Sequence, residues 1–278
     1  MKIAIASGKG GTGKTTFATL FAHAIRPSTY VDADVEEPNG HIFLKPEIEE
    51  EKDFSELVPK IIDEKCTFCG ICADECPYKA LVILKPTKKW LFFPELCHSC
   101  GICAYVCPVK GALVEVPKKK GVIRKGKAGN IKFMEGILNL GEPTPVPLIS
   151  SLLREIDEKD QNVIIDAPPG TSCPVVETLG FADFVLLVSE PTPFGIYDLS
   201  LAVELTRDLK KPFAIIENKY NPDNHLLEDY AKKENIDILY RLPFEEEIAK
   251  SYSKGELPFE RFEESLRQLY EEIKRRVK

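Results

Sequence analysis

The apolar residues of this chain fall into short uninterrupted runs, several of them followed by a longer stretch in which apolar positions repeat with helical spacing. The runs lie at Ile3–Ala6, Thr29–Val31, Asn162–Asp166, Val185–Val188 and Ala214–Glu217, and their length and continuity predict buried strands. Uninterrupted apolar strands that alternate with helices are typical of a parallel sheet covered on both faces. The pattern therefore predicts an α/β fold built on a doubly wound, mostly parallel sheet.

Two stretches outside these runs have a clear helical repeat, at residues 14–25 and 259–277. In the second, one face of the helix carries the apolar residues Phe259, Phe262, Leu266, Leu269 and Ile273. We expect this face to pack on the body of the protein rather than on a membrane, because the polar side of the helix mixes both charges.

The middle of the chain is less regular. Residues 36–60 are rich in Pro and Glu and are expected to be irregular. Gly121–Lys125 and Lys132–Leu138 are predicted as two strands, which a hairpin would join, and residues 145–156 as a helix. A basic stretch at residues 118–127 leaves two interpretations open, a solvated hairpin or a docking patch for an acidic redox partner.

Composition narrows the class of protein. The 278 residues carry a formal net charge of −7, and an acidic chain has no general reason to bind nucleic acid or an anionic membrane. No apolar run approaches the ~18 residues that span a bilayer. The chain opens directly on a strand pattern without a signal peptide, so we expect a cytoplasmic protein.

A glycine-rich loop follows the first strand and opens the first helix. Its sequence is Gly8-Lys9-Gly10-Gly11-Thr12-Gly13-Lys14-Thr15-Thr16, which contains the G-x-x-x-x-G-K-T pattern of a phosphate-binding loop. Glycines let backbone N–H groups turn toward phosphates, and the helix N-terminus adds its dipole. Lys14 would bridge the β- and γ-phosphates and the Thr15 hydroxyl would bind Mg²⁺, so the motif predicts a site for ATP or ADP with Mg²⁺.

Eight of the nine cysteines form two runs of identical spacing, C-x-x-C-x-x-C-x-x-x-C-P. The first run consists of Cys66, Cys69, Cys72 and Cys76, and the second of Cys97, Cys100, Cys103 and Cys107. Bacterial ferredoxins have this spacing, with three thiolates on one iron–sulfur cluster and the fourth on the other. A pair of zinc knuckles is the alternative, but the third cysteine, the fixed three-residue step and the trailing proline favour iron and sulfide.

The ferredoxin pattern also predicts how the ligands cross between the runs. One 4Fe–4S cluster would take Cys66, Cys69, Cys72 and Cys107, and the other would take Cys97, Cys100, Cys103 and Cys76. A domain of about 55 residues buries too little apolar surface to fold stably without a bound metal centre or another cross-link. We therefore predict an inserted ferredoxin-like α+β domain at residues 61–116, inside a discontinuous P-loop domain of residues 1–60 and 117–278.

Lys9 gives the phosphate-binding loop a second lysine near its start. A loop of this form resembles the deviant phosphate-binding loop of the MinD/ParA (SIMIBI) ATPases. The resemblance implies that Lys9 reaches across an ATP-dependent homodimer to the phosphates of the partner subunit, and that hydrolysis is slow without a partner protein.

Further segments resemble this family. Asp32-Ala33-Asp34 resembles its switch I, which implies that Asp34 activates the attacking water and that Asp32 belongs to the magnesium shell. Asp166, at the start of Asp166-Ala167-Pro168-Pro169-Gly170-Thr171, resembles the Walker B aspartate that holds Mg²⁺ through water. Asn218 resembles the residue that recognises adenine, and Pro243 the later segment beside the base.

Nearly the whole chain resembles the MinD-superfamily ATPases that contain an inserted ferredoxin domain. Three functions follow as hypotheses: ATP-gated electron transfer to an unknown redox partner, an accessory ATPase in the assembly of iron–sulfur or other metal cofactors, and a positioning ATPase with structural clusters. Cys173 lies outside both runs, and it is either a buried structural thiol or a ligand or redox sensor between subunits.

Overall fold

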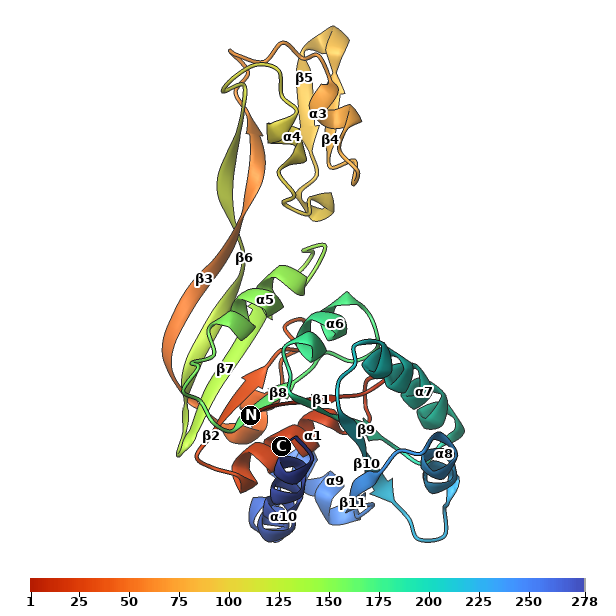
Figure 1. The fold of residues 1–278 in the computed structure, drawn as a ribbon. Coiled ribbons are helices and arrows are strands. Elements are labelled where there is room, and N and C mark those ends of the chain that lie inside the picture. The colour runs from red at the N-terminus through yellow and green to blue at the C-terminus, as the bar shows by residue number, and fades with distance from the viewer. Residues whose placement is uncertain (278) are drawn as a thin grey trace. The chain divides into compact units, whose positions relative to one another are not determined.

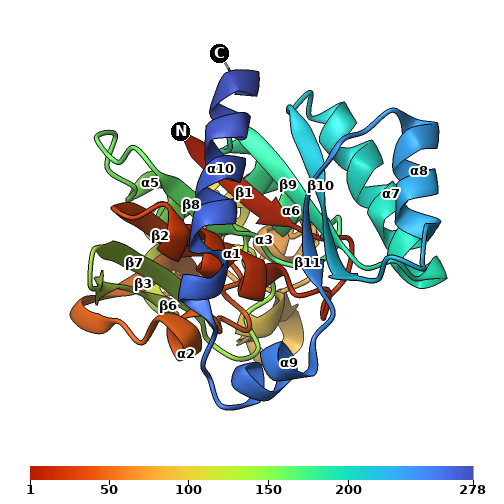
Figure 2. The ribbon, with the colours of Figure 1, turned by 90° about the horizontal axis from the view of Figure 1, so that it is seen from below.

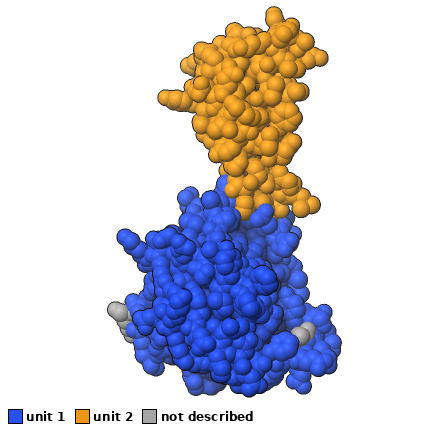
Figure 3. All heavy atoms as spheres, turned by 90° about the vertical axis from the view of Figure 1, so that its right-hand side faces the viewer, with its two compact units in different colours: residues 1–51, 123–137, 146–278 blue, residues 52–122, 138–145 orange. Residues whose placement is uncertain are grey.

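The computed structural model describes residues 1–277, with residue 249 described for its backbone alone. The chain divides into two compact units, coloured separately in Figure 3. Unit 1 comprises residues 1–51, 123–137 and 146–278, and unit 2 comprises residues 52–122 and 138–145.

A single sheet forms the frame of unit 1. Its strand order in the described residues is β11-β10-β9-β1-β8-β2-β7-β6-β3. The strands are β1 Lys2–Ala6, β2 Ser28–Asp32, β3 Glu47–Ile61, β6 Leu113–Ala128, β7 Ile131–Leu138, β8 Val163–Asp166, β9 Phe184–Ser189, β10 Phe213–Tyr220 and β11 Ile238–Pro243. Every pairing from β11 across to β7 is parallel, which confirms the predicted mostly parallel sheet.

Helices cover both faces of this sheet (Figures 1 and 2). They are α1 Lys14–Ala24, α2 Gly40–Leu44, α5 Val146–Arg154, α6 Cys173–Gly180, α7 Pro193–Asp208, α8 Leu226–Glu234, α9 Glu246–Ser253 and α10 Phe259–Val277. Alternate residues of β1 face opposite sides, so Ile3 and Ile5 join one core with α1 and α10, whereas Ala4 and Ala6 join another with α6, α7 and α8.

The C-terminal helix packs as its sequence predicts. Leu266 and Ile273 of α10 are fully buried in the core that α1 also lines. The apolar face of α10 is therefore occupied within the chain. In residues 1–277, no helix combines the length and the low polarity that a membrane crossing requires.

The expectation that residues 36–60 are irregular is wrong, because most of this segment lies in α2 and the long strand β3. The acidic side chains of β3 meet basic side chains of the neighbouring strand β6. Arg124 pairs with Glu51 at 2.7 Å and Lys127 with Glu49 at 2.8 Å. Opposite charges on adjacent strands stabilise a sheet that a glutamate-rich segment alone would not form.

The basic stretch of β6 finds its partners inside the chain. Each of its six basic residues has an acidic partner, as in the pairs Lys118–Glu142, Lys119–Asp53, Lys120–Glu56, Arg124–Glu51, Lys125–Glu155 and Lys127–Glu49. Charges that are already paired attract an acidic protein weakly, so the structure favours a hairpin over a docking patch. β6 and β7 are joined by Gly129 and Asn130, a two-residue connection that requires an antiparallel pair.

Unit 2 is small, and its cysteines form part of its core. It contains the antiparallel strands β4 Leu81–Leu84 and β5 Lys89–Phe92, the short helices α3 Ile71–Asp74 and α4 Ile102–Tyr105, and the 3-10 turns η1 Lys85–Thr87 and η2 Pro94–Leu96. One apolar cluster contains Cys76 and Cys97, and a second contains Cys72. Unit 2 begins before and ends after the inserted domain predicted at residues 61–116, because β3 and β6 run through the boundary.

Candidate nucleotide site and cysteine-lined pockets

The phosphate-binding loop lies between β1 and α1, as its sequence predicts. Gly11 and Gly13 have the left-handed backbone angles φ +78° and +87°, which glycine adopts without strain. A β-carbon on Gly8 would lie 2.0 Å from the carbonyl oxygen of Asp198. The glycines are therefore required by backbone conformation and by close approach.

Lys14 is buried at the start of α1, with its ammonium beside a carboxylate. Its Nζ lies 2.6 Å from Oδ1 of Asp166, and the Tyr30 hydroxyl donates to Oδ2 of Asp166 at 3.0 Å. Burial alone would lower the pKa of Lys14, but the Asp166 carboxylate outweighs it and the pKa is raised. Lys14 therefore carries its charge within the loop.

Asp32 organises the segment that follows β2. Its Oδ1 accepts a hydrogen bond from the backbone N–H of Asp34 at 3.2 Å, and its Oδ2 accepts from Asn39 at 3.1 Å and from Gly40 at 2.9 Å. Asp32 is also the register partner of Asp166 across β2 and β8. The structure thus places the two predicted magnesium aspartates side by side at the carboxyl end of the sheet.

The two carboxylates after β2 are costly to ionise when no cation is present. Burial, together with the nearby charge of Asp166, raises the pKa of Asp32 to about 8. Burial also raises the pKa of Asp34 to about 6, against the opposing effect of Lys14. A divalent cation beside Asp32 would favour the ionised carboxylates, which suits the predicted magnesium role of Asp32.

Lys9 forms its contacts within its own chain. Its Nζ lies 3.1 Å from Oε1 of Glu190 and 4.0 Å from Oδ2 of Asp198. Glu190 also accepts a hydrogen bond from Lys219 at 2.7 Å. The predicted reach of Lys9 into a partner subunit stays a prediction.

The two predicted base-binding segments lie against the phosphate-binding loop. Asn218 at the end of β10 donates from Nδ2 to the Thr12 carbonyl at 2.6 Å. One pocket is lined by loop residues Gly11 and Gly13, by Asn218, and by Leu242, Pro243, Phe244 and Tyr252. Thr12 Oγ1 is buried and has no hydrogen-bond partner. A pocket with aromatic side chains and an amide in its lining, beside a glycine-rich loop, fits a nucleotide.

The sequence analysis did not predict that Glu135 lies beside the candidate nucleotide site. This residue of β7 is 1% exposed and pairs in register with Asp32. Its carboxylate lies 3.0 Å from Nδ1 of His41 and 3.6 Å from Arg124. The signal was a single acidic residue inside the apolar run of Ile131–Leu138. Tyr252 was also missed, since nothing near it in the sequence indicates a base pocket.

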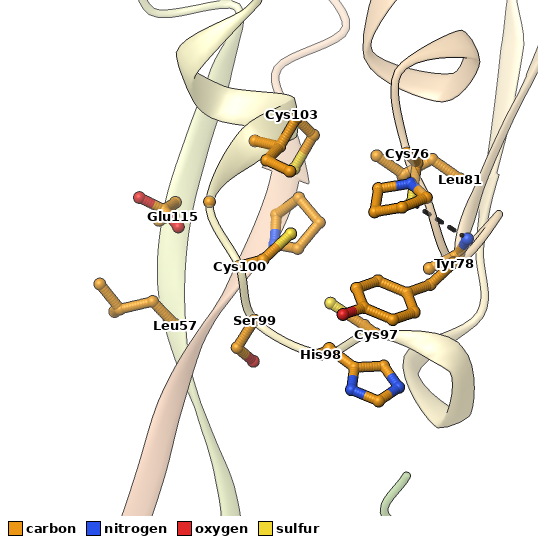
Figure 4. A pocket seen from close by; sticks show the side chains of 15 residues that line it. Leu57, Cys76, Tyr78, Leu81, Cys97, His98, Ser99, Cys100, Cys103 and Glu115 are labelled. Atoms are coloured by element: carbon orange, nitrogen blue, oxygen red, sulfur yellow. Dashed lines mark hydrogen bonds between the residues drawn. The ribbon is translucent and has the colours of Figure 1, made fainter. Parts of the chain in front are cut away.

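The eight cysteines of the two runs line two separate pockets in unit 2. The first, shown in Figure 4, is lined by Cys76, Cys97, Cys100 and Cys103. The second is lined by Cys66, Cys69, Cys72 and Cys107. Each pocket thus takes three thiols from one run and the fourth from the other. This is the membership that the ferredoxin spacing predicts, and iron ligation by these thiols stays a prediction.

The backbone around these thiols offers hydrogen bonds to sulfur. The N–H of Phe68 donates to Cys66 Sγ at 3.3 Å, and that of Ala80 donates to Cys76 Sγ at 3.4 Å. The N–H of Ile71 lowers the pKa of Cys69, whereas burial raises the pKa of Cys103 to about 11. Across the described part of the chain, no group of three or more His, Cys, Asp or Glu residues is arranged to hold a single metal ion.

Cys173 lies apart from both pockets, at the first position of α6. Its side chain is exposed. The interpretation of Cys173 as a buried structural thiol is therefore wrong.

Comparison with known proteins gives the family. Residues 3–259 match the CobQ/CobB/MinD/ParA nucleotide-binding domain. An uncharacterized protein of Methanocaldococcus jannaschii is 31% identical over 268 residues, 92% of this chain and 90% of the relative. A second from the same organism is 31% identical over 283 residues, 99% of this chain and 96% of the relative.

The fold is also similar to a solved structure, the septum site-determining protein MinD of Pyrococcus horikoshii complexed with Mg-ADP. The TM-score is 0.59 at 15% identity, covering 98% of this chain and 94% of that one. The chain belongs to the CobQ/CobB/MinD/ParA nucleotide-binding family. It is a nucleotide-binding, MinD/ParA-like ATPase, and nucleotide binding at the loop of residues 8–16 stays a prediction.

Proposed function

We propose that this ATPase is an iron–sulfur protein in which nucleotide-driven rearrangement of a homodimer controls electron transfer. The observation that carries the proposal is the lining of the two pockets in unit 2, four thiols in each, with one thiol exchanged between the runs. Two 4Fe–4S clusters held in this way would accept and donate single electrons.

The backbone around the thiols and the burial of the thiols also fit iron–sulfur clusters. Gly70 and Gly101 have the left-handed φ angles +92° and +76°, and each ends a Cys-x-x-Cys-Gly turn at the start of α3 or α4. Such turns aim backbone N–H groups toward the thiols. The burial that raises the pKa of Cys103 disfavours a free thiolate there, and coordination to iron would offset that cost.

At the nucleotide site, Thr15, Asp32 and Asp166 would hold Mg²⁺, which would neutralise charge on the β- and γ-phosphates. Lys14 would bind the phosphates in place of its present partner Asp166. Asp34 would orient the attacking water and accept its proton. Asn218 and Pro243 would hold the adenine, and Lys9 would leave Glu190 to reach the partner subunit when ATP closes the dimer.

The test is made on anaerobically purified protein. About eight irons and eight sulfides per chain are expected from two four-iron clusters. Dithionite-reduced protein is then mixed with an acceptor in the presence of ATP, ADP or no nucleotide, and reoxidation is followed by stopped flow. Equal rates in all three conditions would reject nucleotide gating, and zinc in place of iron would reject the clusters.

The likeness of fold to a septum site-determining protein favours a second candidate, a positioning ATPase whose clusters are structural. In that case the clusters would not cycle reversibly between redox states, whereas ATP would still change the oligomeric state. A role in cofactor assembly would instead appear as ATP-dependent gain of iron by an apo-protein acceptor.

A further inference from the structure

Two lysines of residues 1–277 have buried side chains, Lys14 and Lys120. Lys14 belongs to the phosphate-binding loop. Lys120 lies on β6 in unit 2, and its side chain is 2% exposed. A buried ammonium is costly unless its environment needs the charge, so the position of Lys120 requires an explanation.

The ammonium of Lys120 lies at the wall of one cysteine-lined pocket. Its Nζ donates to the backbone carbonyl of Cys97 at 3.2 Å, and Cys97 lines the pocket of Figure 4. Two carboxylates face the same ammonium, Glu56 at 3.1 Å and Glu142 at 3.7 Å. Lys120 therefore lies between a pocket thiol residue and two acids.

The segment of residues 138–145 fixes this arrangement within unit 2. The backbone N–H of Asn139 donates to the Lys120 carbonyl at 2.8 Å. Lys118 holds the second oxygen of Glu142 at 2.8 Å. Glu142 Oε2 is buried and makes no hydrogen bond, and the Lys120 ammonium lies 3.7 Å from it.

We propose that Lys120 is a positioning residue that raises the reduction potential of the centre held by Cys76, Cys97, Cys100 and Cys103. The inference rests on the proposed function, since it assumes that this pocket holds a cluster. One-electron reduction of the centre, by dithionite in the test below, adds one negative charge to it. A fixed positive charge in a water-poor site stabilises that added charge.

The second pocket has a different kind of lysine near it. Lys85 lies against Gly70, and its side chain is exposed to solvent. Water and salt screen an exposed ammonium far more than a buried one. The two centres should therefore differ in potential, and the electron should rest on the centre beside Lys120.

The test is an anaerobic redox titration of the loaded protein, followed by electron paramagnetic resonance. Lys120→Met should move one midpoint to a more negative potential and leave the other in place. Lys120→Arg, which keeps the charge, should restore the wild-type midpoint. The matched control is Lys85→Met, which should leave both midpoints within error of wild type.

Lys120→Met removes the cation that Glu56 and Glu142 share, which could destabilise the unit even though Glu142 keeps its pair with Lys118. Lys120→Met/Glu142→Gln reduces this cost by removing one of the two acids. Its shifted midpoint should lie between those of wild type and Lys120→Met. In a Cys69→Ala background the surviving centre should still respond to Lys120→Met. Unchanged midpoints, or an equal shift of both, would overturn the role of Lys120. A protein without iron would overturn the proposed function instead.

Discussion

The two compact units support their binding sites in different ways. In unit 1 the site residues stand at the carboxyl ends of β1, β2, β8 and β10, on a sheet with a core on each face. In unit 2 the cysteines are themselves core residues, with Cys72, Cys76 and Cys97 less than a tenth exposed. The residues of the first site are held by a core to which they contribute little. The cysteines of the second site form part of the core that holds them.

The strongest test of this contrast removes a core thiol. Cys97→Ala should release the cluster of its pocket and increase amide hydrogen exchange throughout residues 52–122 by ~10-fold or more. Nucleotide binding by unit 1 should persist, because the apolar core of unit 1 shares no residue with the apolar clusters that contain the cysteines. Hydrogen exchange read by mass spectrometry measures both units in one experiment.

Cys173→Ala is the matched control, since this exposed thiol lies outside both pockets and should change nothing. If Cys97→Ala left exchange in residues 52–122 at the wild-type rate, the cysteines would not be supplying the core of unit 2.

The corresponding change in unit 1 is Lys14→Ala. It should reduce ATP hydrolysis by at least ~10²-fold, since a charge aimed at the phosphates is lost. It also leaves Asp166 buried without its ion-pair partner, which should lower the free energy of unfolding by about 3 kcal/mol. ATPase assays and urea denaturation measure the two effects separately.

The double change Lys14→Ala/Asp166→Asn separates binding from stability. It should recover much of the stability and none of the activity. Recovery of activity would mean that Lys14 serves the fold and not the phosphates.

The pH dependence of unit 1 provides a weaker but more specific test. The pKa of Asp32, about 8, and that of Asp34, about 6, both lie above their values in an unfolded chain, near 3.9. The folded protein therefore binds more protons between pH ~4 and 8, and its free energy of unfolding should fall as pH rises through that window. Thermal melts at a series of pH values measure the slope.

Asp32→Asn should flatten that slope in nucleotide-free protein, and Mg-ADP should flatten it in the wild type by favouring the ionised carboxylates. A slope that Asp32→Asn leaves intact would place its origin elsewhere in the molecule.

Features that depend on local sequence were predicted, whereas features that depend on contacts between distant residues were not. Lys14, Asp32, Asp166 and Asn218 follow strands in the sequence, so local pattern alone places them at one edge of a parallel sheet. Cysteine spacing is likewise a local signal. The strand β3 was missed because its partners, such as Arg124 for Glu51, lie more than seventy residues away, and Glu135 was missed because only the register of β7 against β2 brings it to Asp32.

The smallest expected effect concerns the exposed ion pairs of β3 and β6. Lys127 and Glu49 are more than half exposed, and such pairs contribute about 0–1 kcal/mol. Lys127→Gln should therefore lower the free energy of unfolding by less than about 1 kcal/mol, and 1 M salt should reduce the difference further. Arg124→Gln is the informative companion, because Arg124 also lies 3.6 Å from the buried Glu135. In urea denaturation, Arg124→Gln should lower the free energy of unfolding more than Lys127→Gln does, and salt should change this effect less. Equal effects of the two variants would mean that the charges of β6 act alike whether their partners are exposed or buried.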